Sequence, residues 1–183
     1  LNQVDREMEA GNFETAIDFC TKAMVMMKEN AKKPKRKGAE NPMALYPLAL
    51  EKRARAHEKS GKIESAVNDM AQCILQIEKV PLLPKDQPMA ESYFHYGTLL
   101  FISKRDGWMK PAVRAFRMVI EIFTSSELQK TEMFYSAHFY LGVIYALRGE
   151  KLLAYPLSVT ATKCEKDSPA YHVAVRQCGL LGV

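Results

Sequence analysis

The sequence predicts an all-α fold in which antiparallel helical hairpins stack into a solenoid. Residues 61–66 (GKIESA) repeat the pattern of residues 11–16 (GNFETA): a glycine, a polar residue, an apolar residue, two more residues and an alanine. Each copy opens a stretch of apolar residues at helical spacing, and no alternating strand pattern exceeds four residues. The glycine would form a left-handed turn between two antiparallel helices, and the alanine would let them approach closely. Recurrence of such a unit is typical of helical solenoids.

Two further copies extend the pattern along the chain. Residues 148–154 repeat it, and residues 106–112 form a looser version. With these copies the chain resembles the tetratricopeptide repeat family, in which a Leu-Gly pair and an aromatic on the first helix precede Gly-x-apolar-x-x-Ala at the start of the second. The matching residues are Leu141, Gly142, Tyr145, Gly149, Ala154 and Ala161 in the fourth copy, and Ala54, Gly61, Ile63, Ala66 and Cys73 in the second. The resemblance implies a right-handed superhelical array of about four repeats over nearly the whole chain.

The spacing of the copies departs from a regular array. The anchor alanines, which are Ala16, Ala66, Ala112 and Ala154, lie 50, 46 and 42 residues apart, compared with roughly 34 in a tight array. The excess is expected in loops, mainly residues 28–42 and 80–84. Pro156 follows an anchor alanine by two residues, so we expect it to kink its helix.

Capping residues predict the order of the elements within one domain of residues 1–183. The expected hairpins cover residues 1–29, 43–79, 88–124 and 131–165, with a basic loop at 30–41 and a capping helix at 169–179. Asn41-Pro42 could start the third helix, and Pro47 is an alternative start. Asp86 is expected to cap the fifth helix, Ser168-Pro169 to start the last one, and Gly179 to end it.

The positive charge is concentrated in one loop. The chain carries a net charge of +5, and five basic residues with no acid among them lie at Lys32, Lys33, Lys35, Arg36 and Lys37. Without this run, 21 basic residues face 21 acidic ones, whereas a solenoid that follows a phosphate backbone should spread its cations along one face. The run itself is open to three interpretations: a solvated loop, a contact for an acidic partner, or a nuclear-import signal.

No residue pattern predicts catalysis, a metal site or a cofactor. Cys20, Cys73, Cys164 and Cys178 are far apart in the sequence, which indicates reduced, mostly buried thiols. The histidines at 57, 95, 138 and 172 have no ligand spacing, and no nucleophile or phosphate-loop motif is present. No signal peptide or apolar run near 18 residues is visible. We therefore expect a non-enzyme in the cytoplasm, or in the nucleus if residues 32–37 act as an import signal.

The resemblance also implies a concave groove lined by the first helix of each hairpin. Its positions here are Leu48, Glu51, Lys52, Arg55 and Lys59, then Glu91, Phe94, His95, Thr98 and Phe101, and finally Ser136, Phe139, Tyr140 and Val143. Such a groove would be cationic at one end and aromatic at the other. Exposed aromatics suggest binding anchors, but Phe94, Phe101 and Phe139 could equally pack between neighbouring hairpins.

These observations predict a non-catalytic adaptor that binds a peptide or a helix of a protein partner in its groove, within a larger assembly. The expected contact residues are Lys52, Arg55, Lys59, Phe94, His95, Phe139, Tyr140 and Val143. The alternative is an RNA-binding helical repeat of a ribonucleoprotein. Equal repeat lengths would favour a one-base-per-repeat code, and the uneven steps between the anchor alanines argue against it.

Overall fold

The computed structural model describes residues 1–33, 41, 43–79, 86–126, 128, 130–164, 166 and 169–180. All regular elements in this part of the chain are α-helices, as predicted. The chain divides into two compact units, Leu1–Leu83 and Pro84–Val183. The expected single domain of residues 1–183 stays a prediction.

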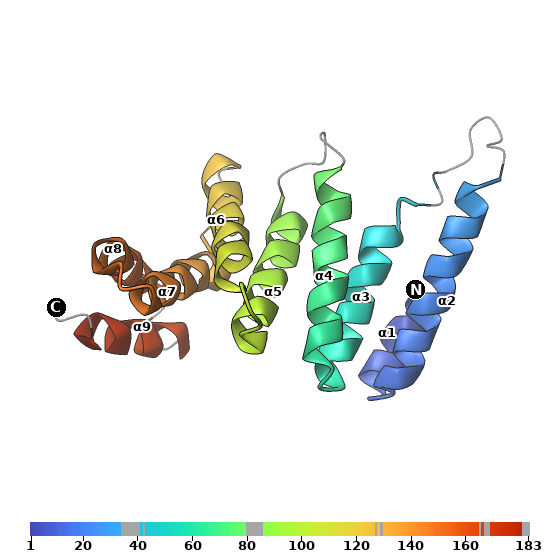
Figure 1. The fold of residues 1–183 in the computed structure, drawn as a ribbon, viewed down its shortest axis with the longest axis horizontal. Coiled ribbons are helices and arrows are strands. Elements are labelled where there is room, and N and C mark those ends of the chain that lie inside the picture. Colours follow the sequence, from blue (N-terminus) through green and yellow to red (C-terminus); the bar gives the residue numbers. More distant parts are fainter. Residues whose placement is uncertain are drawn as a thin grey trace. The chain divides into compact units, whose positions relative to one another are not determined.

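The first unit consists of two antiparallel hairpins. Its helices are α1 (Asn2–Glu9), α2 (Phe13–Ala31), α3 (Tyr46–Lys59) and α4 (Ile63–Glu78). Helix α1 pairs with α2, α3 pairs with α4, and α2 packs against α3 (Figure 1). Consecutive helices are therefore neighbours in space throughout this unit.

The second unit repeats this plan and adds a final helix. Its helices are α5 (Gln87–Ser103), α6 (Met109–Ser125), α7 (Glu132–Leu147), α8 (Lys151–Ala161) and α9 (Pro169–Leu180). Helices α5 and α6 form one hairpin and α7 and α8 the next, with α6 against α7 (Figure 1). Helix α9 packs against both α7 and α8, as expected of a cap on the fourth hairpin.

The turns within the hairpins confirm the role predicted for glycine. Gly11, Gly61, Gly107 and Gly149 all adopt a positive φ of between 74° and 77°, a region that is costly for residues with a Cβ. In three of these turns the amide after the glycine bonds to a carbonyl five residues earlier, at 2.8–2.9 Å, which is the Schellman motif. The turn between α5 and α6 differs, because Lys104 is also left-handed, with φ 46°.

The anchor alanines lie at equivalent buried positions in the second helix of each hairpin. Ala16, Ala66, Ala112 and Ala154 are all completely buried. Each donates its N–H to the carbonyl four residues earlier, at the N-cap of α2, α4, α6 or α8, at distances of 3.0–3.1 Å. The repeat register read from the sequence is therefore confirmed.

Several helix ends differ from expectation. Helix α3 begins at Tyr46 with Pro47 in its first turn, so the alternative start is the correct one. Helix α8 contains Pro156 and ends at Ala161, and α9 runs through Gly179 to Leu180. The capping residue of α5 is confirmed, because Asp86 accepts a 3.1 Å hydrogen bond from the Met89 amide. Pro42 and Ser168 lie outside the described residues.

Candidate partner-binding grooves

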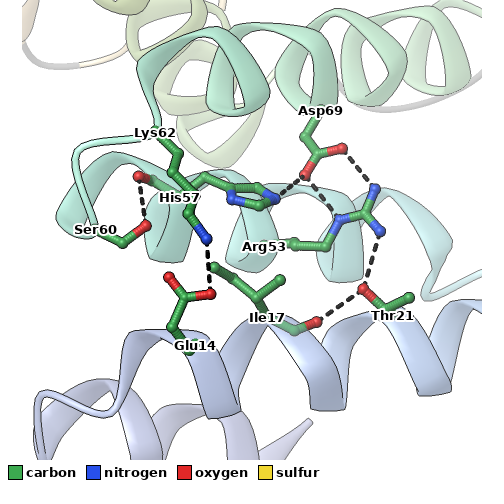
Figure 2. Close-up of polar contacts among 8 residues, drawn as sticks. All are labelled: Glu14, Ile17, Thr21, Arg53, His57, Ser60, Lys62 and Asp69. Atoms are coloured by element: carbon green, nitrogen blue, oxygen red, sulfur yellow. Dashed lines mark hydrogen bonds and ion pairs between the residues drawn. The ribbon is translucent and has the colours of Figure 1, made fainter.

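A polar network fixes α3 between α2 and α4 in the first unit (Figure 2). Arg53 donates from Nε and Nη2 to the two carboxylate oxygens of Asp69, at 2.8 and 2.6 Å. Its Nη1 donates to Thr21 Oγ1 at 3.1 Å, so one guanidinium links all three helices. The side chain of Asp69 is only 6% exposed, and a bidentate pair of this kind sets both distance and angle. The hydrogen bonds to Asp69 raise the pKa of Arg53.

Two further side chains complete this network at the turn between α3 and α4 (Figure 2). His57 Nε2 lies 3.7 Å from Asp69 Oδ2. Burial lowers the pKa of His57, against an opposing effect of the Asp69 charge. Lys62 Nζ bonds to Glu14 Oε2 at 2.7 Å and joins the start of α4 to α2. These contacts fix the rotation of α3 and thereby the side chains that it presents to α1.

A groove of about 450 Å³ lies between α1 and α3 in the first unit. It is lined by Asp5, Met8, Glu9, Leu48, Glu51, Lys52 and Arg55. Lys52 forms an ion pair with Asp5, and Arg55 pairs with Glu51 at 2.7 Å. The expectation of a cationic end is wrong for this groove, because α1 contributes two acids that an argument from α3 alone leaves out. Lys59 is exposed further along α3 and does not line the groove.

Most of the predicted aromatic end is occupied by packing within the second unit. Tyr140 stacks on Phe116, with ring centroids 4.9 Å apart and planes 7° apart, and it also meets Phe94 and Phe101 edge-on. Phe116 is completely buried, and burial raises the pKa of Tyr140. A Cβ at Gly97 would lie 2.8 Å from the Phe116 ring, so α5 and α6 touch there. This cluster of α5, α6 and α7 favours the packing interpretation for Phe94 and Phe101, and Tyr140, which the sequence assigns to the groove, packs with them.

An apolar groove of about 440 Å³ lies beside α7 and α9 in the same unit. Its lining residues are Phe139, Val143, Ala146, Leu147, Lys151, Val173, Arg176 and Leu180. Phe139 and Val143 belong to the predicted contact residues, whereas His95 is half-buried on α5 and does not line this groove. Leu147 is 59% and Leu180 82% exposed, so the lining includes open apolar surface.

The contribution of α9 to this groove was not foreseen from the sequence. The sequence predicts a capping helix at residues 169–179 that shields the fourth hairpin. Val173, Arg176 and Leu180 are three and four residues apart, which places them on one face of a helix. That spacing is the signal that could have identified a second wall of the groove.

The basic loop is described only at its beginning. Lys32 and Lys33 are exposed, and Lys33 Nζ donates to Asn30 Oδ1 at 2.9 Å. Lys35, Arg36 and Lys37 lie outside the described residues.

Other features relevant to function can be stated for the described residues alone. They contain no group of three or more His, Cys, Asp or Glu side chains arranged to hold a metal ion. Cys20, Cys73, Cys164 and Cys178 are free thiols, and burial raises the pKa of Cys20 to about 11 and of Cys73 to about 12. None of the described helices combines the length and the apolar character needed to cross a membrane.

Comparison with known proteins gives matches in structure and none in sequence. No protein-family model and no curated protein matches the chain. MamA matches with a TM-score of 0.66 and 18% identity, over 97% of this chain and 81% of MamA. The TPR-like repeats of a putative kinesin light chain from Podosopora anserina match with a TM-score of 0.68 and 14% identity, over 98% of this chain and 82% of that chain.

Two further structures extend the likeness. BtubC from P. vanneervenii has a TM-score of 0.71 and 13% identity, over 97% of this chain and 68% of BtubC. The Rap conjugation gene regulator of plasmid pLS20, solved with the Phr* peptide, has a TM-score of 0.54 and 17% identity, over 97% of this chain and 45% of Rap. At these identities the likeness concerns the fold, and it agrees with the turn glycines and anchor alanines described above. The chain has the fold of tetratricopeptide-like helical repeats.

Proposed function

We propose that the chain is a non-catalytic scaffold for protein–protein interactions, and that the α7/α9 groove binds a peptide or a helix of a protein partner. The observation that carries this proposal is the exposed apolar lining of the groove beside Lys151 and Arg176. Contiguous exposed apolar surface with a polar rim is typical of interaction sites. The lining suits a segment with apolar side chains flanked by acidic ones.

The structural neighbours support peptide recognition by this fold. Rap, of which this chain covers 45%, was solved as a complex with the Phr* peptide, and this supports a peptide ligand for the fold. None of the structures named above is described as an RNA-binding protein. The protein-binding function is therefore preferred over the RNA-binding alternative.

The α1/α3 groove is a second, weaker contact surface in this proposal. Lys52 and Arg55 could reach acids of a partner only by giving up their present pairs with Asp5 and Glu51. Exposed pairs of this kind contribute little, about 0–1 kcal/mol each, so exchange is feasible but gains little affinity. Direct contacts of Lys59 and His95 with the partner also stay predictions.

Two features of the setting are part of the same proposal. The exposed Lys32 and Lys33 begin a run that suits an acidic partner or an import receptor. The free thiols suit a reducing compartment such as the cytoplasm. Action within a larger assembly is part of the same proposal, and the exposed apolar lining of the α7/α9 groove supports it.

The test is a matched pair of surface substitutions in the second unit. Leu147→Glu places a charge in the groove, whereas Ile102→Glu makes the same change at a similarly exposed position, 56% against 59%, that does not line it. Peptides selected from a displayed library on the parent protein would be titrated against both variants by calorimetry. We expect Leu147→Glu to weaken binding by about 1–3 kcal/mol and Ile102→Glu to leave it unchanged.

The composition of the selected peptides is a second readout. Enrichment of segments that combine apolar and acidic residues would agree with the proposal. Peptides that bind both variants as well as the parent, or a library that yields no binder, would show that this groove is not the binding site.

A further inference from the structure

The turn between α5 and α6 is built differently from the other hairpin turns. Lys104 follows the end of α5 with a φ of 46°, and Gly107 supplies a second left-handed residue with φ 74°. Among the described residues, Lys104 is the one non-glycine residue with a positive φ. The longer turn brings basic residues to this end of the hairpin.

A pocket of about 660 Å³ lies over this turn within the second unit. It is lined by Lys104, Arg105, Asp106, Gly107, Trp108, Met109, Lys110 and Arg148. Four of these side chains are basic and one is acidic. Lys104 and Lys110 are exposed, and neither forms an ion pair with another described residue. The pocket therefore carries uncompensated positive charge.

Neighbouring contacts hold one of these cations in place and extend the basic surface. The Arg148 guanidinium lies 5.7 Å from the centroid of the buried Tyr145 ring, and its Nη2 is 2.7 Å from Glu150 Oε1. Arg117 of α6 lies 5.9 Å from the same ring and donates a hydrogen bond to the Tyr145 hydroxyl. A guanidinium that is already oriented loses less freedom when it binds a carboxylate.

The second unit is basic on its own account, because the run at residues 32–37 belongs to the sequence of the first unit. The second unit contains 12 basic and 9 acidic residues. The first unit contains 9 basic and 12 acidic residues when the run at 32–37 is left out. The overall balance predicted from the sequence thus conceals a basic second unit, and the pocket holds a third of its basic residues.

We propose that this pocket, formed by Lys104, Arg105, Lys110 and Arg148, binds an acidic segment of a protein partner. Several cations spread around an open pocket match consecutive carboxylates along an extended chain better than one small anion. Binding of single-stranded nucleic acid usually adds aromatic side chains on which bases stack. Here Trp108 is 8% exposed, and its ring meets Phe101 edge-on at 5.4 Å, so it offers no free face. The pocket shares no lining residue with the α7/α9 groove, and this proposal does not depend on peptide binding in that groove.

The experiment uses a fluorescein-labelled hexaglutamate peptide and the full chain. Binding is followed by fluorescence anisotropy at low salt for the parent and for Lys104→Gln/Lys110→Gln. The matched control is Lys163→Gln/Lys166→Gln, which removes the same charge from exposed positions of the same unit. These lie beyond the C-terminal end of the 11-residue α8, roughly 16 Å from the turn that carries Arg148. We expect the pocket variant to bind the peptide about tenfold more weakly and the control to match the parent.

Three further measurements make the assignment decisive. Binding should weaken as sodium chloride rises from about 50 to 500 mM, because exposed charges are screened. Leu180→Ser, an uncharged change in the lining of the apolar groove, should bind hexaglutamate like the parent, which separates this site from the α7/α9 groove. The melting curve of the pocket variant, followed by circular dichroism, should match that of the parent. If the double variant is less stable, the binding comparison is repeated with Lys110→Gln alone.

Three outcomes would overturn the proposal. The parent could fail to bind hexaglutamate, or the control could lose as much affinity as the pocket variant, which would mean general charge attraction. A single-stranded RNA of twelve nucleotides could also bind more tightly than the peptide and be lost in the pocket variant, which would assign the site to nucleic acid instead.

Discussion

In the first unit, Arg53 and Asp69 tie α3 to α4 through two short hydrogen bonds. In the second unit, α5, α6 and α7 meet through aromatic rings around Tyr140 and Phe116. The backbone plan is the same in both, with left-handed glycines in the turns and buried alanines beyond them. The repeat pattern therefore constrains how helices turn and approach, and it leaves the chemistry between them free.

The two units also differ in the grooves at their surfaces. The α1/α3 groove carries acids and bases that neutralise each other, whereas the α7/α9 groove is mainly apolar with two cations. Because charged side chains of the α1/α3 groove already form ion pairs with each other, a partner would gain little binding energy by pairing with them. Exposed apolar surface does gain from being covered, at roughly 25 cal/mol per Å². For this reason the second unit is the better candidate for partner binding.

The largest expected effect is the loss of the central ring of the aromatic cluster. Phe116→Ala should destabilise the second unit by about 3–5 kcal/mol, because it leaves a cavity beneath Tyr140 and beside Gly97. Trp108 is the single tryptophan of the chain and lies in this unit, so its fluorescence during urea unfolding reports the loss there.

Phe139→Ala is the matched control for this prediction, since it removes an equal ring that is only half-buried. Its cost should be clearly smaller, about 1–2 kcal/mol. Equal costs for the two variants would mean that the cluster is not the centre of stability in this unit.

The second effect tests the polar network of the first unit. Asp69→Ala leaves the Arg53 guanidinium mostly buried without its carboxylate, so we expect a loss of about 2–3 kcal/mol. Glu64→Ala removes an exposed acid from the same helix and should stay within about 0.5 kcal/mol of the parent. Hydrogen exchange followed by mass spectrometry over residues 46–78 would localise the change to α3 and α4.

One result would contradict the prediction for Asp69→Ala. Unaltered exchange in α3 and α4 of Asp69→Ala would show that small apolar contacts, and not the ion pair, hold these helices together. The contrast between the ion-paired contact of the first unit and the aromatic contact of the second would then not extend to stability.

The features that could be predicted from the sequence are those that depend on residues close together in the chain. A turn glycine and an anchor alanine are separated by five residues, and Asp86 lies three residues before the amide that it caps. Spacing alone is enough to recognise them, because the backbone geometry of a turn or a first helical turn depends on neighbours in the sequence.

The features that could not be predicted depend on contacts between helices. Arg53 and Asp69 are 16 residues apart, and nothing in their spacing indicates a bidentate pair. Tyr140 occupies a position that the resemblance assigns to the groove, yet the large ring of Phe116 draws it into packing. Asp5 neutralises Lys52 from another helix. Side-chain direction and size at helix crossings decide all three, and one sequence does not reveal them.

The third effect compares equivalent positions in the two units. Ala66→Leu and Ala154→Leu each force a larger side chain into a completely buried crossing, at a cost of about 1–3 kcal/mol. Similar decreases in melting temperature would support a shared backbone plan beneath different interiors. A variant that melts like the parent would show that its crossing can widen, and the equivalence of the two alanines would be lost.

The smallest expected effect is the loss of folding stability at acidic pH. It compares the two units through one histidine in each, His57 in the first and His138 in the second. Burial lowers the pKa of both His57 and His138. Below the unfolded value of about 6.5 the unfolded chain binds more protons, so stability is fully present above that pH and is lost as the pH falls through the folded pKa.

The neighbouring charges predict which histidine contributes more. At His57 the Asp69 charge opposes burial, with Arg53, Lys62 and Glu14 as smaller influences. At His138 the hydrogen bond to the Phe134 carbonyl opposes burial and the Lys130 charge acts with it. His138 is buried whereas His57 is half-buried, so burial is the stronger influence at His138. His138→Gln should therefore remove more of the decrease in unfolding free energy between pH 7.5 and 5.5 than His57→Gln. Glutamine can still donate to the Phe134 carbonyl, which His138 Nδ1 reaches at 2.9 Å, so the comparison isolates protonation. A larger effect of His57→Gln would mean that Asp69 does not offset burial in the polar unit, and urea titrations at the two pH values would show it.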